Sequence, residues 1–163
     1  MDIALKIISG GQTGVDRAGL DVAIELGIPH SGYCPKGRRA EDGVIPENYN
    51  LMETDSEMYA VRTEQNVEKS DGTLILFQNT INGGTLTTLE YCRGLDKPCF
   101  TVNLEKSAKM KLIKFKQWVK KNHIQTLNIA GPREDGSGVY ALAKIFLKKC
   151  VLKTFKPQRK IPV

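Results

Sequence analysis

The segment from Lys6 to Arg17, KIISGGQTGVDR, constrains the possible folds more than any other stretch of the chain. A short apolar run of strand type stops abruptly at Gly10 and Gly11, and apolar residues at helical spacing begin at Val15. The pattern therefore predicts a strand, a short turn rich in glycine, and a helix. Ligands of open α/β sheets bind at the carboxyl ends of strands, which is where this turn lies.

The same turn has the features of an anion-binding site. Glycine lets the backbone approach a ligand closely, and the free N–H groups of a first helical turn attract an anion such as phosphate. Thr13 followed by Asp16 fits a capping box, which predicts a helix start near Thr13. The spacing is neither GxGxxG nor the Walker sequence. A plainer interpretation, in which the glycines only relieve crowding in a tight turn, stays open.

The rest of the chain alternates strand and helix patterns. Strands are predicted at residues 28–34, 51–54, 72–77, 98–103 and 124–130, and helices at 58–69, from 85 onward, at 107–121 and after 139. This alternation predicts a three-layer α/β fold with a mostly parallel sheet and helices on both faces. The length of 163 residues fits one domain. We assign residues 1–152 to this domain and residues 153–163 to a basic tail.

Two further loops are candidates for function. A second glycine-rich strand-to-helix turn contains Gly83 and Gly84, and right-handed crossovers place it on the same sheet edge as the first turn. The polar segment 35–50 is longer than the usual 2 to 6 residues of a βα connection, and such loops are often functional. Within it, Lys36 and Arg38 offer cationic donors for an anionic ligand.

The composition excludes several classes of protein. With 40% hydrophobic and 26% charged residues the chain is typical of a soluble globular protein, and no apolar run approaches the ~18 residues of a membrane span. The amino terminus lacks the basic region of a signal peptide. The four cysteines form no CxxC pair, so we expect reduced thiols and no metal site. These features predict a cytoplasmic protein.

The charge is unevenly distributed along the chain. Residues 106–163 contain 15 Lys and Arg against 2 Asp and Glu, whereas residues 1–105 contain 9 against 16. Such a basic segment can contact nucleic acid, an acidic protein partner or another subunit, or it can form a solvated lysine face. Nucleic acid is the less favoured partner, because the lysines lack interleaved aromatic residues and arginine pairs.

The segment from Arg62 to Glu90 resembles the lysine-decarboxylase-like or LOG family. The signature of that family is a helix with Arg-Lys, a buried strand and GGxGTxxE. Gly83, Gly84 and Thr87 match the glycine-rich part, Glu90 matches its glutamate, and Arg62 stands where the family has its arginine. Two positions depart from the signature: Leu86 replaces the third glycine, and Thr63 replaces the lysine.

A closer resemblance covers residues 8–140. Four segments occur in order, SGGQTGVDRAGLDVA, GYCPKGRRAEDG, NGGT and AGPRE, and they look like those of the molybdenum carrier family, a Rossmann-like branch of the same superfamily. The resemblance implies a Rossmann-like fold and binding of molybdenum cofactor, a pterin that bears a phosphate and a dithiolene holding the metal. It also implies a homo-oligomer, because relatives of this fold are often dimeric or larger.

The candidate ligand-binding residues are Gly10, Gly11, Gln12, Thr13, Gly14, Asp16, Lys36, Arg38, Arg62, Gly83, Gly84, Thr85, Thr87, Glu90 and Arg133. Backbone N–H groups of the two turns would hold phosphate or oxo groups, and the arginines would add charge-assisted hydrogen bonds. Each also has a plainer interpretation. Arg62 could be a surface residue, Glu90 could pair with a neighbouring cation, and Arg133 could simply follow a turn.

Three functional hypotheses follow. The first is a non-catalytic carrier of molybdenum cofactor or of a similar phosphorylated pterin or nucleotide-like ligand. The second is a phosphoribohydrolase of LOG type, in which Glu90 would support cleavage of the glycosidic bond and Arg62 would orient the substrate. The third is a nucleotide-sensing module that signals through residues 106–163. Leu86 argues against the enzyme, because a side chain there could crowd a ribose phosphate.

Overall fold

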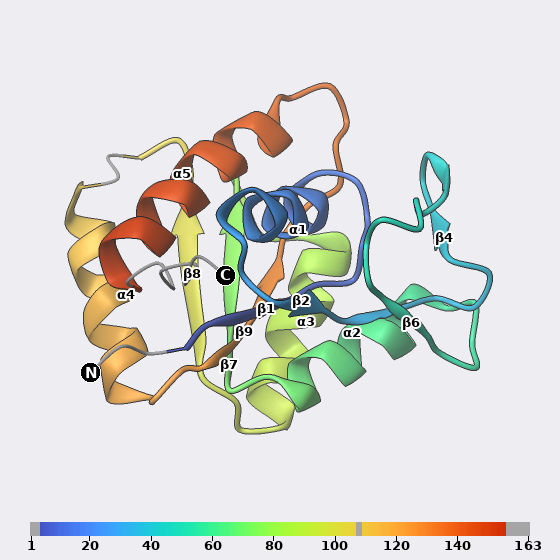
Figure 1. Ribbon diagram of the computed structural model, residues 1–163, viewed down its shortest axis with the longest axis horizontal. Coiled ribbons are helices and arrows are strands. Elements are labelled where there is room, and N and C mark those ends of the chain that lie inside the picture. Colours follow the sequence, from blue (N-terminus) through green and yellow to red (C-terminus); the bar gives the residue numbers. More distant parts are fainter. Residues whose placement is uncertain (1–3, 107–108, 156–163) are drawn as a thin grey trace, which may run out of the picture.

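The computed structural model describes residues 4–106 and 109–155 of the chain (Figure 1). Its elements are, in chain order, β1 (Lys6–Ile8), α1 (Val15–Leu26), β2 (His30–Ser31), β3 (Tyr33–Cys34), β4 (Arg39–Ala40), β5 (Gly43–Val44), β6 (Met52–Glu53), α2 (Tyr59–Lys69), β7 (Gly72–Phe77), α3 (Gly83–Gly94), β8 (Cys99–Asn103), α4 (Lys109–Lys121), β9 (Thr126–Ala130) and α5 (Val139–Thr154). The main sheet has five strands in the order β2-β1-β9-β7-β8. All neighbouring strands in it are parallel.

Helices cover both faces of this sheet. α1, α4 and α5 pack together on one face, and α2 and α3 pack together on the other (Figure 1). β7 reads GTLILF and is buried over its first five residues, as expected for a strand covered on both sides. The predicted three-layer, Rossmann-like α/β fold is therefore confirmed.

The strand order brings distant segments together. β9 is the last strand in the chain, yet it lies in the middle of the sheet and pairs with both β1 and β7. The turns that follow β1, β9 and β7 therefore leave the sheet side by side at its carboxyl edge. Gly10 and Gly83, predicted to lie on one edge, both line the cavity described below.

The strand predicted at residues 28–34 is wrong in one respect, because it divides at Gly32. The φ angle of Gly32 is +141°, and a Cβ there would lie 2.1 Å from the carbonyl oxygen of Ser9. The chain turns at this glycine, since no other residue fits. β2 stays in the main sheet, whereas β3 leaves it to pair with β6, the brief strand predicted at residues 51–54.

Segment 35–50, predicted as a loop without regular structure, contains the antiparallel hairpin of β4 and β5. Beneath it lies a small second core of Leu20, Cys34, Ala40, Ile45, Tyr49 and Leu51. Arg38 has a positive φ of 52°, and its guanidinium donates to four backbone carbonyl oxygens, three in this segment and one at Leu51 just after it. Its donors hold the loop closed and are not directed at a ligand.

The helix boundaries differ slightly from the predictions. The start predicted at Ser107 lies outside the described residues, and α4 is described from Lys109. α5 continues to Thr154, so the predicted tail begins within a helix, and residues 156–163 lie outside the described part. Leu142, predicted to face inward on α5, is 38% exposed. None of the helices in the described ranges is long and apolar enough to span a membrane.

Candidate ligand-binding site

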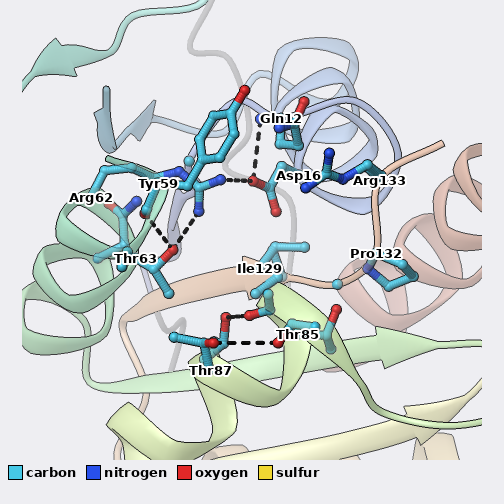
Figure 2. Close-up of a pocket in the computed structure, with 18 of the residues that line it drawn as sticks. Gln12, Asp16, Tyr59, Arg62, Thr63, Thr85, Thr87, Ile129, Pro132 and Arg133 are labelled. Carbon is cyan, nitrogen blue, oxygen red and sulfur yellow. Dashed lines mark hydrogen bonds and ion pairs between the residues drawn. The ribbon is translucent and has the colours of Figure 1, made fainter. Parts of the chain in front are cut away.

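A polar cavity of about 490 Å³ lies at the carboxyl edge of the main sheet. It is bounded by the turn after β1, the first two turns of α2, the start of α3, and the end of β9 with the residues that follow it (Figure 2). Asn128, Ile129 and Ala130 of β9 contribute its floor. Its position agrees with the general rule that ligands of open α/β sheets bind outside the carboxyl ends of strands.

The start of α3 is open toward this cavity. The backbone N–H groups of Gly83, Gly84 and Thr85 donate to no acceptor among the described residues, and the N-cap residue Asn82 makes no side-chain capping bond. All three of these residues line the cavity. Unpaired N–H groups at a helix N-terminus are a natural anion-binding site, strengthened by the positive end of the helix dipole.

At the start of α5, by contrast, N–H groups are already hydrogen-bonded to a side chain of the same segment. The carboxylate of Glu134 accepts hydrogen bonds from the N–H groups of Gly136, Gly138 and Tyr140, each at 3.0 Å. The Tyr140 bond, first among several backbone bonds, keeps the pKa of Glu134 below its usual value. This helix end therefore already holds an anion from its own chain.

The first turn of α1 is also largely closed, and the predicted capping box is wrong. The helix starts at Val15, and its N-cap Gly14 has no side-chain capping bond. Val15 N–H donates to the Pro132 carbonyl at 3.2 Å, while the hydroxyl oxygen of Thr13 accepts from Glu134 N–H at 3.3 Å. The loop after β9 therefore takes the Thr13 hydroxyl that the capping box would have used, and the Asp16 carboxylate accepts Gln12 N–H instead.

The turn after β1 likewise uses most of its N–H groups internally. Gln12 N–H donates to Asp16 Oδ2 at 3.2 Å, and Thr13 N–H donates to the side-chain oxygen of Gln12 at 3.0 Å. That oxygen also accepts Glu41 N–H at 2.9 Å, which fastens the β4–β5 hairpin to the turn. Gln12 and Asp16 reach the cavity with their side chains, but the predicted cradle of backbone donors at Gly10 to Thr13 is largely absent.

Asp16 is the buried carboxyl group of the cavity. It is only 4% exposed. Burial raises its pKa to about 6, and the opposing effect of the Arg62 guanidinium is smaller. Oδ2 accepts from Gln12 and lies 4.0 Å from Arg62 Nη2, whereas Oδ1 has no hydrogen-bond partner among the described residues. Figure 2 shows this second oxygen directed into the cavity.

Arg62 rests on the backbone of Gly10. A Cβ at position 10 would lie 2.8 Å from Cζ and Nε of the guanidinium, so the absence of a side chain makes room for it. Nη1 donates to the hydroxyl of Thr63 at 2.6 Å. Nε is buried without an acceptor in the described part of the chain. A buried donor of this kind is costly, which indicates that the guanidinium is incompletely satisfied without a ligand.

Tyr59 stands at the centre of three guanidinium groups. The Cζ atoms of Arg39, Arg62 and Arg133 lie 5.2, 5.5 and 5.9 Å from its ring centroid. They come from the hairpin, from α2 and from the loop after β9. Arg133 is also paired with Glu41 of the hairpin. The positive charge of the site is thus gathered around one aromatic ring.

The structure brings together nine of the predicted site residues around the cavity: Gly10, Gln12, Asp16, Arg62, Gly83, Gly84, Thr85, Thr87 and Arg133. Six others lie elsewhere: Gly11, Thr13, Gly14, Lys36, Arg38 and Glu90.

The residues outside the cavity have identifiable surroundings. Gly11, with φ of +76°, packs against Ile45 and Leu51, and a Cβ on Gly14 would lie 2.4 Å from the Pro132 carbonyl oxygen. Lys36 is exposed. Glu90 is exposed on α3 and does not line the cavity, so the geometry gives it no contact with a ligand there.

Sequence reasoning missed Tyr59 and Asn128. Tyr59 is the first residue of α2, one turn before Arg62, and its helical spacing from Arg62 was the available signal. Asn128 lies within a strand whose apolar pattern hides it, and its amide donates to the Thr73 hydroxyl of β7 at 3.2 Å. No local pattern marks that residue.

A parallel, doubly covered sheet with a polar cavity at its carboxyl edge defines a Rossmann-like α/β domain. Within that class, the chain belongs to the circularly permutated YpsA SLOG family, whose model matches residues 7–151. The resemblance to LOG-like proteins and molybdenum carriers is thereby confirmed at the level of the family.

One solved structure shows the same relationship. The chain is 43% identical to a protein of Syntrophus aciditrophicus SB, whose crystal structure bears the name "Putative molybdenum carrier protein". The match covers 91% of this chain and 96% of that chain, with a TM-score of 0.87. No curated protein is similar enough to count as a match.

Proposed function

We propose that this protein binds and carries a small phosphorylated ligand, either molybdenum cofactor or a similar pterin- or nucleotide-like molecule. The observation that carries the proposal is the cavity that the unpartnered N–H groups of α3 share with Arg62 and Arg133. A phosphate group is the ligand chemistry that such N–H groups and guanidinium groups both attract. The name of the Syntrophus aciditrophicus protein supports molybdenum cofactor among these ligands.

The residues of the cavity fit the parts of such a cofactor that a protein must hold. The metal of molybdenum cofactor is held by the cofactor's own dithiolene, so the protein need only bind phosphate and pterin. The α3 N-terminus suits the phosphate, and the polar groups of Asp16, Arg62 and Asn128 suit a heterocycle with donors and acceptors. The cavity volume of about 490 Å³ is within the usual range for small-molecule sites.

The test is native mass spectrometry of the protein as purified, with metal analysis of the same sample. We expect an added mass of a phosphorylated pterin or nucleotide, which disappears when Arg62 and Arg133 are both changed to Ala. A protein that is purified empty and binds neither nucleoside monophosphates nor pterin phosphates would refute the proposal.

The same spectrum reports the number of subunits, and we expect a homo-oligomer. A second proposal about partners needs a separate experiment. Removal of lysine charges within residues 106–163 tests the acidic protein partner proposed for that segment. Loss of a co-purifying acidic protein in such a variant supports the partner, whereas an unchanged set of co-purifying proteins contradicts it.

A second candidate function is cleavage of a glycosidic bond in a nucleoside monophosphate. Glu90 lies outside the cavity, but Asp16 places a different carboxyl group inside it, and burial raises the pKa of that group to about 6. A carboxyl group in this range can act as a general acid or base near neutral pH. A release assay for free base across a panel of nucleoside monophosphates distinguishes the two functions. Turnover that Asp16→Asn abolishes would favour the enzyme.

A further inference from the structure

The two ends of the cavity differ in electrostatic character. At one end, the first turn of α3 has no acidic side chain and presents three N–H groups without an acceptor among the described residues. At the other end, Asp16 and Arg62 lie side by side, with Oδ2 and Nη2 4.0 Å apart. Figure 2 shows the side chain of Ile129 between them and the α3 residues Thr85 and Thr87. A ligand that fills the cavity therefore meets a donor end at α3 and, at Asp16 and Arg62, a mixed end that offers both an acceptor and a cation.

The mixed end has one acceptor that nothing in the described chain uses. Oδ2 of Asp16 is held by Gln12 N–H at 3.2 Å, which fixes the plane of the carboxylate and leaves Oδ1 in the cavity. The side chain is only 6% exposed. The carboxyl group is largely shielded from bulk solvent, and Oδ1 faces the cavity as an acceptor, so a group that donates a hydrogen bond gains by occupying this position.

The same carboxylate excludes an anion from the mixed end. Arg62 is the nearest cation, but its Nη1 is already used by Thr63 at 2.6 Å and its Nη2 faces Asp16. A phosphate oxygen placed against Asp16 Oδ1 would set two acceptors against each other without a proton between them, which a neutral O–H or N–H donor avoids. The anionic group of a ligand is therefore directed to α3.

We infer that Asp16 fixes the orientation of the ligand and selects its chemical class: a phosphate monoester whose opposite end presents a neutral O–H or N–H donor to Asp16 Oδ1. This inference rests on the proposed function, since it assumes that a phosphorylated ligand occupies the cavity. Two kinds of ligand group can supply this neutral donor. One is a sugar hydroxyl, and the other is the N–H edge of an aminopyrimidinone, which guanine and pterins have in common.

The experiment compares four probes by titration calorimetry with the full chain. GMP carries both kinds of donor, 2′,3′-dideoxy-GMP lacks the sugar hydroxyls, purine riboside 5′-monophosphate lacks both the amino group and the N1–H of the base, and pyrophosphate has an anion at both ends. We expect GMP to bind more tightly than pyrophosphate. Removal of the donor that contacts Asp16 should weaken binding about tenfold. The analogue that binds more weakly than GMP shows whether the donor is a sugar hydroxyl or an N–H group of the base.

Asp16→Asn is the decisive variant. Its amide oxygen can keep the bond to Gln12 N–H and then presents an N–H₂ group in place of Oδ1. The variant should lose about tenfold in GMP affinity, gain affinity for pyrophosphate, and no longer distinguish GMP from the weakened analogue. Asp96→Asn is the matched control, because it makes the same change at an exposed residue that does not line the cavity, and it should change none of these values. Melting temperatures confirm that both variants are folded.

The outcomes separate this inference from the proposed function. If GMP and both analogues bind equally, or if Asp16→Asn binds GMP as wild type does, the inference is wrong while the proposed function stands. If the nucleotides, pyrophosphate and pterin phosphates all fail to bind to folded wild-type protein, the proposed function and this inference both fail.

Discussion

Gly10→Ala tests whether the first glycine turn serves the ligand through Arg62. The new Cβ would lie 2.8 Å from Cζ and Nε of Arg62 and 2.9 Å from Cδ. Ordinary contacts of this kind are near 3.5 to 4 Å, so the guanidinium must move away by roughly an ångström. Its hydrogen bond to Thr63 and its position beside Asp16 are then lost.

The expected loss of binding is that of one hydrogen bond to a charged group, about 1.5 to 3 kcal/mol, or roughly a tenfold to hundredfold rise in Kd. The fold should change little. Gly10 has no positive φ, and replacing such a glycine by alanine stabilises a protein by about 0.4 to 1 kcal/mol. That gain offsets part of the cost of moving a flexible side chain. We therefore expect a melting temperature close to that of wild type.

Titration calorimetry with GMP and thermal unfolding provide the two measurements. Gly94→Ala is the control, since Gly94 lies at the end of α3 with no atom within 4 Å of its added Cβ. It should leave GMP binding unchanged. In an Arg62→Ala background, Gly10→Ala should cost nothing further, because both changes remove the same contact. Additive losses, or unchanged GMP affinity in the single variant, would refute the reasoning.

Three further predictions follow from the same geometry. Gly84→Val places a side chain in open space at the start of α3 and should weaken GMP binding more than tenfold with little loss of stability. Gly11→Val should chiefly lower the melting temperature, because its Cβ meets Leu51 at 2.6 Å. A stability loss for Gly84→Val and a binding loss for Gly11→Val would contradict this assignment. Asp16→Asn should stabilise the fold by about 1 to 3 kcal/mol at pH 7.5. The pKa of about 6 in the folded protein lies above the ordinary aspartate value of 3.8, so the cost of ionising Asp16 is present above pH 6 and disappears toward pH 4. Denaturant unfolding of wild type and Asp16→Asn at pH 7.5 and near pH 4 checks this. A difference in the free energy of unfolding that is the same at both pH values would contradict it. Glu90→Gln should leave GMP affinity within about twofold of wild type, since Glu90 is exposed outside the cavity; a larger change by calorimetry would return Glu90 to the site.

The sequence by itself determined the fold class and nine of the residues that line the candidate site. Alternating strand and helix periods determine a doubly covered parallel sheet, because each period buries one face of its element. The glycine-rich turns at Gly10 and Gly83 also follow from local pattern, since glycines between a strand and a helix mark a break wherever the chain goes next.

Tertiary structure alone decided which donors stay free. Thr13 and Asp16 have the spacing of a capping box, yet the loop after β9 takes the N–H and hydroxyl groups of that turn. In the described part of the chain, α3 meets no such loop, so its first N–H groups remain without acceptors there. Which of two similar helix ends is satisfied depends on residues more than a hundred positions away, and no local pattern contains that information.

The same reason explains Arg38, Arg62 and Glu90. All three are charged residues in motifs of the expected family, and the sequence does not distinguish their roles. Packing around segment 35–50 commits Arg38 to backbone carbonyls, the bare backbone of Gly10 admits Arg62 to the cavity, and the helical rotation of α3 turns Glu90 toward solvent. A charged side chain acquires its role from the groups that the fold places within a few ångströms of it, because hydrogen bonds and buried charge pairs act only at that range.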